Sequence, residues 1–276
     1  MGLTMKIADL TGSYSAQRLP IASGNRMLQA LPPAILSQLI PHMDRIELRR
    51  DEVLAEAHSS MSRVHFIEHG LALFTKMMSD GRSTMTGSVG REGMTMPNML
   101  SGARRTGVEC VVLIPGTALS IDRSVLFGLA LKSPPLGHMI QQYSLFMNEQ
   151  ITQISACNRL HSLEQRYARF LLTVHQNAEG RPFTLTQEMM AITLGAQRPH
   201  ISVVATQFRK KNLIEYRHGQ MRVINPERLR LASCECHDIL KESAETMYLP
   251  SPSGDLPSCH VFHEGMFFES GCARPR

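Results

Sequence analysis

The sequence lacks any apolar run that approaches the roughly 18 residues needed to cross a membrane. Residues 1–20 contain no apolar segment of the kind found in secretory signal peptides. No internal repeat and no extended low-complexity stretch is present. These absences argue against membrane, secreted and repeat proteins, so we expect a cytoplasmic protein with no membrane partner.

Cysteine is scarce and scattered. The six cysteines lie at positions 110, 157, 234, 236, 259 and 272, which is too dispersed for a disulfide framework. Cys110 and Cys157 each fall on an apolar pattern, where a cysteine is usually an inert small hydrophobic residue.

The C-terminal cysteines and histidines offer soft ligands for zinc. Cys234, Cys236 and His237 precede a linker-like stretch at 250–257, and more of these residue types follow at 259, 260, 263 and 272. The Cys-x-Cys-His order is not a standard zinc-finger spacing. We therefore assign no metal ligand and no cofactor, and we expect residues 233–276 to form a flexible tail.

Positive charge is concentrated in one part of the chain. Between Arg181 and Leu231, nine Arg and Lys residues are set against three Glu and no Asp, a net charge of +6. The whole chain carries only +5, so the remainder sums to −1. A localised basic segment of this kind is typical of a nucleic-acid-binding surface.

The same basic segment contains a predicted helix-turn-helix at 184–213. Thr186 is a suitable N-cap, and Gly195 suits the left-handed residue that ends a helix. A second helix begins at once, with Pro199 in its first turn. Its apolar residues recur at helical spacing from Ile201 to Phe208, so the opposite face is free to enter the major groove of DNA.

The side chains on the exposed face of this second helix predict how it recognises DNA bases and phosphates. Arg198 can fork onto a guanine, whereas Pro199 and Val203 can offer only apolar contact to a thymine methyl group. Arg209 and Lys210 suit phosphates. The full set of predicted DNA contacts is Thr186, Gln187, Gln197, Arg198, Pro199, His200, Ser202, Val203, Arg209, Lys210 and His218. An ordinary packed helix pair with a solvated basic face is the alternative.

Three further patterns complete the chain. Residues 213–224 alternate around His218-Gly219, which predicts the two-stranded wing of a winged helix. Residues 23–132 contain short predicted strands separated by glycine turns at 68–70, 79–81, 89–93 and 115–116, after a short helical pattern at 25–43. The apolar spacing of residues 134–159 predicts a long helix. Its apolar seam needs a partner, which is either the roll of the same chain or a second subunit. We assign that seam to a homodimer, through Leu136, Ile140, Tyr143, Met147, Ile151 and Ile154.

This order of elements resembles the Crp/Fnr superfamily of bacterial transcription regulators. The matching segments are Asn25–Leu28, Val64–Gly70, Asp80-Gly81, Val89–Gly93, Glu164–Arg166, and Leu185–Glu188 through Leu194-Gly195. The resemblance implies an α+β protein, and its parts would be an extension at 1–22, a cyclic-nucleotide-binding-like antiparallel β-roll at 23–132, a dimerisation helix at 133–160, a winged helix-turn-helix at 161–232 and the tail. It also implies double-stranded DNA and RNA polymerase as partners.

The resemblance also shows what this chain lacks. Nucleotide-binding members carry Gly-Glu and then Arg-Ser/Thr in the roll, where this chain has Met96-Pro97 and Arg105-Thr106. Without the carboxylate, a buried ribose hydroxyl would be left unpaired, so we expect no classical cyclic-AMP sensing. Iron–sulfur members carry an N-terminal cysteine cluster, and here no cysteine precedes Cys110.

Two alternatives to a transcription regulator stay open. A cupin-like metal enzyme would need the roll histidines His58, His65 and His69 to converge on one ion. An architectural DNA-binding protein would share the helix-turn-helix but sense nothing. We expect a regulator that is not an enzyme.

Overall fold

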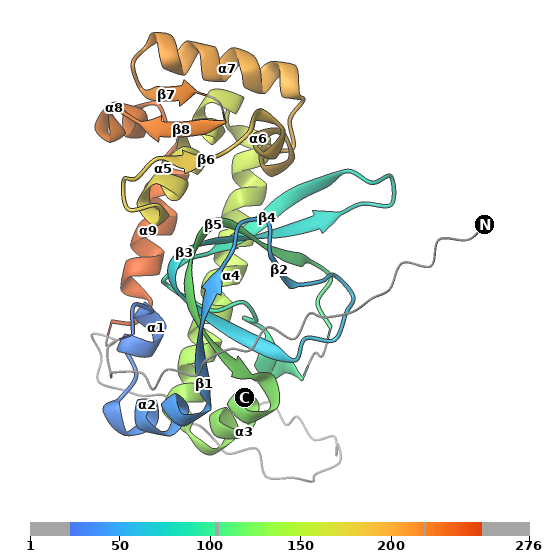
Figure 1. Ribbon diagram of the computed structural model, residues 1–276, viewed down its shortest axis with the longest axis vertical. Helices are drawn as coiled ribbons and strands as arrows, with labels where there is room; N and C mark the ends of the chain where they lie inside the picture. The colour runs from blue at the N-terminus through green and yellow to red at the C-terminus, as the bar shows by residue number, and fades with distance from the viewer. Residues whose placement is uncertain (1–22, 103–104, 218, 250–276) are drawn as a thin grey trace, which may run out of the picture.

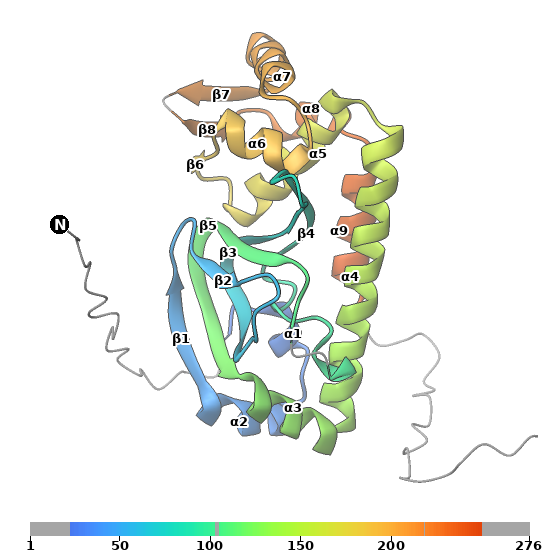
Figure 2. The same cartoon turned by 90° about the vertical axis from the view of Figure 1, so that its right-hand side faces the viewer.

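The computed structural model describes residues 23–102, 105–217 and 219–249. A β-roll occupies one end of the molecule and a helix-turn-helix unit the other, as Figure 1 shows. The long helix α4 (Pro134–Leu160) runs beside both, and α9 (Cys236–Thr246) lies against it (Figure 2). The helix α7 (Arg198–Lys210) lies at the end of the molecule opposite the roll (Figure 1).

Two short helices lead into the roll, where the sequence predicted one helical pattern. α1 (Arg26–Gln29) is capped by Asn25, whose side chain accepts a hydrogen bond from the Leu28 amide. The Asn25 side-chain amide donates to the carbonyls of Ile67 and Gly93 at 2.8 Å each, which fixes α1 against the roll. Pro33 begins α2 (Pro33–Leu39), and the 3₁₀ turn η1 (Ile40–His42) follows.

The roll is one antiparallel sheet. Its strands are β1 (Met43–Leu48), β2 (Val53–Ala55), β3 (Arg63–Met77), β4 (Ser83–Val89) and β5 (Glu109–Asp122). They pair in the order β1-β5-β3-β4, and β2 pairs with β5. A 3₁₀ turn, η2 (Met99–Ser101), lies between β4 and β5. The predicted antiparallel roll is confirmed.

Two of the predicted glycine turns are wrong. The sequence predicts that strands end at 68–70 and 115–116, but β3 and β5 run straight through these positions. The pairing register shifts there, between Ile67 and Ala72 on β3. At Gly116 a Cβ atom would lie 2.0 Å from the His69 carbonyl oxygen, so glycine permits a close backbone approach within a bulged pair rather than a turn.

The long helix is confirmed, but its predicted role needs correction. Five of the six seam residues assigned to a dimer are buried inside this chain: Leu136, Ile140, Tyr143, Met147 and Ile154. Four of these pack in the core of the roll, and Ile154 packs in the second core. Only Ile151 is exposed. An apolar seam looks the same whether it covers its own roll or a second subunit, so the pattern could not decide between them.

The elements after α4 form the second core. The helix α5 (Leu163–Asn177) begins at a capping box in which the Ser162 and Gln165 side chains each bond the other residue's backbone. β6 (Phe183–Thr184), β7 (Ile214–Arg217) and β8 (Gln220–Val223) make a small sheet with the order β6-β8-β7. The sequence analysis predicted the β7–β8 wing but not β6 or the earlier helix α3 (Arg123–Lys132).

The C-terminal region is not wholly a tail. After α8 (Pro226–Leu231), residues predicted to be flexible form α9, which packs on α4 and α5. Tyr248 beyond α9 donates a hydrogen bond to the Glu92 carbonyl at 2.7 Å, which ties this end of the chain to the roll. Across the described residues, no helix is both long and apolar enough to span a bilayer.

Candidate nucleic-acid interface

The first helix of the helix-turn-helix forms where its end signals predicted. α6 (Gln187–Leu194) is capped by Thr186, whose side chain accepts a hydrogen bond from the Met189 amide at 3.1 Å. Gly195 ends the helix with φ of 58°, in the left-handed region. Thr186 and Gln187 are half-buried at this helix start.

The second helix, α7 (Arg198–Lys210), has Pro199 in its first turn. Its buried side carries the predicted stripe of Ile201, Val204, Ala205 and Phe208. Phe208 meets the ring of Tyr167 from α5 edge to face, with the centroids 5.3 Å apart. This packing orients α7 so that its other side faces solvent.

The exposed side of α7 holds the predicted DNA contacts, together with its N-cap Gln197. Exposed side chains there are Gln197, Arg198, Pro199, His200, Val203, Arg209 and Lys210, while Ser202 is half-buried. Val203 is 55% exposed although it is apolar. Within the described part of the chain, no ion pair involves Arg198, Arg209 or Lys210. These cations are therefore available to an external anion.

The wing extends the same basic surface. β7 and β8 pair in register from Ile214 with Val223 to Arg217 with Gln220, and Arg217 and Arg222 are exposed. The predicted contact His218 lies outside the described residues. β6 adds a third strand, and the Gln220 side-chain amide donates to the Thr184 hydroxyl at 2.7 Å. The small sheet thus holds the wing beside the helix-turn-helix.

Other contacts fix α6 relative to the rest of the chain. Arg166 of α5 donates to the Leu194 carbonyl at 3.0 Å, so a cation satisfies the C-terminal end of α6. Arg50 from the roll donates to the Thr184 carbonyl at 2.5 Å. α6 also packs on β4, and Gly195 lies against Thr84. The β3–β4 hairpin of the roll therefore touches the helix-turn-helix unit directly.

The residues of the altered nucleotide cassette do come together. Met96, Pro97, Arg105 and Thr106 line one cavity of about 300 Å³ between the roll and α4, with Met147 and Ile151 on the helix side. The Ser144 hydroxyl of α4 donates to the Pro97 carbonyl. None of the described residues that line this cavity is Asp or Glu. It can hold a small ligand, but it offers no carboxylate to a ribose.

The roll histidines do not converge. His58 is exposed, and His69 pairs with Glu179 at 2.8 Å. His65 is buried, and desolvation together with the Arg63 charge lowers its pKa to about 4. Among the described residues, the one cluster of potential metal ligands lies elsewhere, at the junction of α4 and α9. The roll gives a cupin-like metal enzyme no site within the described ranges.

Comparison with known proteins agrees with this architecture. Residues 165–232 match the Crp-like helix-turn-helix domain family. A putative transcriptional regulator of the Crp/Fnr family from Eubacterium rectale superposes with a TM-score of 0.61 at 14% identity, covering 76% of this chain and 98% of the other. No curated protein sequence gives a significant match.

Two further solved structures share the fold. FixK2 from Bradyrhizobium japonicum has a TM-score of 0.59 at 16% identity, covering 70% of this chain and 98% of the other. CLP from Xanthomonas campestris, described as a c-di-GMP responsive global regulator, has a TM-score of 0.57 at 12% identity, with coverages of 70% and 100%. The resemblance noted in the sequence is confirmed: the chain has the fold of the Crp/Fnr superfamily and carries its Crp-like helix-turn-helix domain at residues 165–232.

Proposed function

We propose that this protein is a transcription regulator that binds a palindromic DNA site as a homodimer. The observation that carries the proposal is the exposed face of α7, where basic side chains that form no ion pair with any described residue stand on a Crp-like helix-turn-helix. A face of this kind is suited to the major groove. Contact with RNA polymerase, expected from the family resemblance, is part of the same proposal.

Each exposed group on α7 has a chemical role in this proposal. Arg198, at the N-terminal end, donates two hydrogen bonds to a guanine edge. Val203 offers apolar surface to a thymine methyl group, for which its 55% exposure leaves room. Arg209 and Lys210, at the other end, neutralise phosphates and set the register of the helix on the duplex.

The proposed dimer uses the outward face of α4, because the apolar seam that the sequence predicted for the dimer is buried within the chain. Leu145 is 68% exposed and Ile151 is 45% exposed, and Asn148 lies exposed between them. A two-fold contact there would place two copies of α7 on one side of the pair. Their half-sites would then be about one helical turn apart, roughly 34–36 Å.

We further propose that cyclic AMP is not the effector. The cavity behind Met96 and Pro97 has no carboxylate among its described lining residues, and Pro97 has no N–H to donate. Calorimetry should show no stoichiometric binding of cyclic AMP at micromolar concentration. A stoichiometric isotherm that disappears in Arg105→Ala would contradict this part of the proposal.

Selection from a library of random DNA duplexes tests the function. The full chain should enrich one inverted repeat with half-sites about one helical turn apart, without added nucleotide. If the protein binds DNA only with the affinity typical of non-specific association and enriches no sequence, it is not a sequence-specific regulator. That result would favour the architectural alternative.

A further inference from the structure

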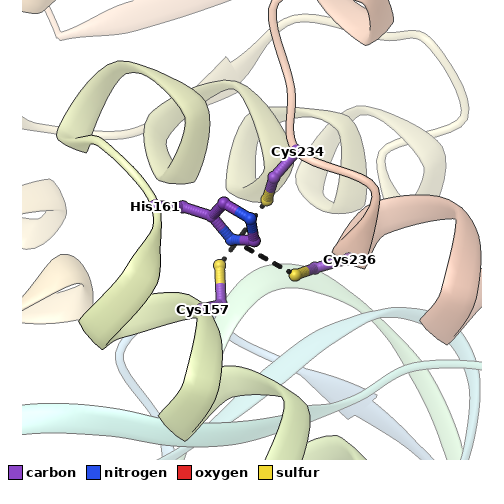
Figure 3. A group of neighbouring side chains, drawn as sticks. All are labelled: Cys157, His161, Cys234 and Cys236. Carbon is purple, nitrogen blue, oxygen red and sulfur yellow. Dashed lines mark hydrogen bonds between the residues drawn. The ribbon is translucent and has the colours of Figure 1, made fainter.

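Four side chains of the types that can bind a metal ion meet where α4 ends and α9 begins. Cys157 and His161 lie at the end of α4, and Cys234 and Cys236 lie at the start of α9 (Figure 3). Their potential ligand atoms all lie within 4.8 Å of one another. The Cys157 and Cys234 sulfur atoms are 3.6 Å apart, and Cys236 Sγ lies 3.5 Å from His161 Nδ1.

The 3.6 Å sulfur–sulfur and 3.5 Å sulfur–nitrogen separations match the edges of a tetrahedral zinc site. With Zn–S bonds of about 2.3 Å and Zn–N bonds of about 2.0–2.1 Å, neighbouring ligand atoms of a tetrahedron lie roughly 3.5–3.8 Å apart. A disulfide between Cys157 and Cys234 would require sulfur atoms about 2.0 Å apart, which the 3.6 Å separation does not satisfy. The geometry therefore favours shared coordination of one ion over a covalent bridge.

The surroundings orient the ligands. Glu235 Oε1 lies 3.2 Å from His161 Nε2, and this contact favours the imidazole tautomer whose Nδ1 lone pair faces the thiols. Gln153 donates from Nε2 to Cys236 Sγ at 3.0 Å. A carboxylate behind a ligating histidine and a donor to a ligating sulfur are common supports of bound metal.

Local charge also suits a set of thiolates. Cys236 is the first residue of α9, where the helix dipole favours a negative sulfur. The Arg169 guanidinium is buried, its charge acts on Cys157, and its Nε and Nη2 have no hydrogen-bond partner among the described residues. Three thiolates around Zn²⁺ carry a net charge of −1, which this buried cation can balance.

We propose that Cys157, His161, Cys234 and Cys236 bind one structural Zn²⁺. Three sulfur ligands and one imidazole are the donors that zinc prefers, and four protein ligands leave no open position for catalysis. All three cysteines are buried, at 4% exposure or less. The ion would fasten α9 to the end of α4, beside the connection into the DNA-binding unit. The site goes beyond the proposed function, and its test does not depend on DNA binding.

Metal content of the full chain tests the proposal. The protein purified without chelator should hold about one Zn²⁺ per chain. Cys157→Ser and His161→Asn should each lose most of it. Two matched controls should keep it: Cys110→Ser, buried in the roll away from the cluster, and the double variant Cys259→Ser with Cys272→Ser, outside the described residues. Equal zinc in Cys157→Ser and the wild type would overturn the assignment.

Cobalt substitution of the wild type gives a second readout that does not rely on the folding of any variant. Co²⁺ in the proposed site should show strong tetrahedral ligand-field absorption and thiolate-to-metal charge transfer. Weak absorption typical of octahedral Co²⁺ would overturn the proposal. So would a metal-free wild type in which mass spectrometry finds Cys157 and Cys234 joined by a disulfide, or zinc that is lost only in the Cys259 and Cys272 variant.

Discussion

Single residues on α7 divide into those that hold the helix and those that face outward. Ile201 and Phe208 are buried and fix its orientation. Arg198 and Lys210 are exposed, and neither takes part in an ion pair within the described part of the chain. Outward residues can therefore be changed with little effect on folding, which makes them suitable probes of DNA binding.

Another residue, His65, makes the stability of the roll depend on pH. Its side chain is 8% exposed, and burial with the nearby Arg63 charge lowers its pKa from 6.5 to about 4. Between these values the unfolded chain binds the proton and the folded chain does not, so stability is full above pH 6.5 and falls as the pH drops toward 4. The loss from this group should be roughly 3 kcal/mol.

Urea unfolding of the wild type and His65→Gln across pH 4–7 measures this contribution. The free-energy difference between the two proteins should change with pH between about 4 and 6.5 and stay level from pH 6.5 to pH 7. Parallel pH curves for the two proteins would show that His65 is not the group responsible.

Among the structural elements, β3 and β5 depend on close backbone approaches, and the one at Gly116 is tighter than the one at Gly70. A Cβ at Gly116 would lie 2.0 Å from the His69 carbonyl oxygen, whereas nothing lies within 4 Å of a Cβ at Gly128 in α3. Gly116→Ala should lower the free energy of unfolding by about 2 kcal/mol or more, because backbone must move. Gly128→Ala, the matched control, should raise it by about 0.5–1 kcal/mol, because alanine favours a helix.

Chemical denaturation of Gly116→Ala and Gly128→Ala measures both predicted changes in the free energy of unfolding. Equal effects at the two positions would mean that the bulged pairing of β3 and β5 does not need glycine at 116.

The proposed dimer depends on the outward face of the helix α4. Leu145→Asp places a charge at a position that is 68% exposed in the single chain, so the fold should persist while a partner helix would bury the charge. We expect the dimer dissociation constant to rise at least about tenfold, which corresponds to roughly 1.4 kcal/mol. Sedimentation equilibrium measures it.

Leu131→Asp is the matched control, because Leu131 is 69% exposed on α3 and is not part of the proposed contact. It should dimerise like the wild type. A wild type that is monomeric at micromolar concentration would reject the dimer, and equal constants for both variants would reject this face.

The elements that could be predicted from the sequence are those with local end signals. Thr186, Gly195 and Pro199 mark the helix-turn-helix through their own backbone chemistry, and all three lie where predicted. The glycines at 70 and 116 instead suggest turns in the sequence. The bulge that requires glycine there forms only when the distant strands β3 and β5 pair, so local sequence does not show it. The sequence also could not show whether the apolar seam of α4 faces the roll or a second subunit, because that too depends on contacts between distant parts of the chain.

The cysteine cluster could not be assigned from the sequence because its two halves are 77 residues apart at Cys157 and Cys234. Cys157 and His161 are spaced i, i+4 at the end of a helix, and this spacing was the one available signal. The other cysteines of the C-terminal region offered competing partners, and α9, which brings Cys236 to α4, was predicted to be tail.

In the whole molecule, the exposed face of α7 lies away from the roll, while α6 of the same helix-turn-helix unit contacts the roll through β4. α4 runs beside both parts (Figure 2), and β4 touches α6. The cavity near Arg105 borders α4. A ligand in that cavity would touch Met147 and Ile151, and the latter lies on the proposed dimer face. In the proposed dimer, this continuity would give a physical route by which the roll influences the spacing of the two copies of α7.

The affinity of wild type, Arg198→Ala and Lys210→Ala for a selected site and for scrambled DNA tests the central claim most directly. The wild type should prefer its site by roughly 10³ or more at about 0.15 M salt. Arg198→Ala should lose about 1–3 kcal/mol on that site alone, whereas Lys210→Ala should weaken both DNAs and reduce the salt slope by about one. Equal losses on both DNAs for Arg198→Ala would contradict the account that α7 reads bases.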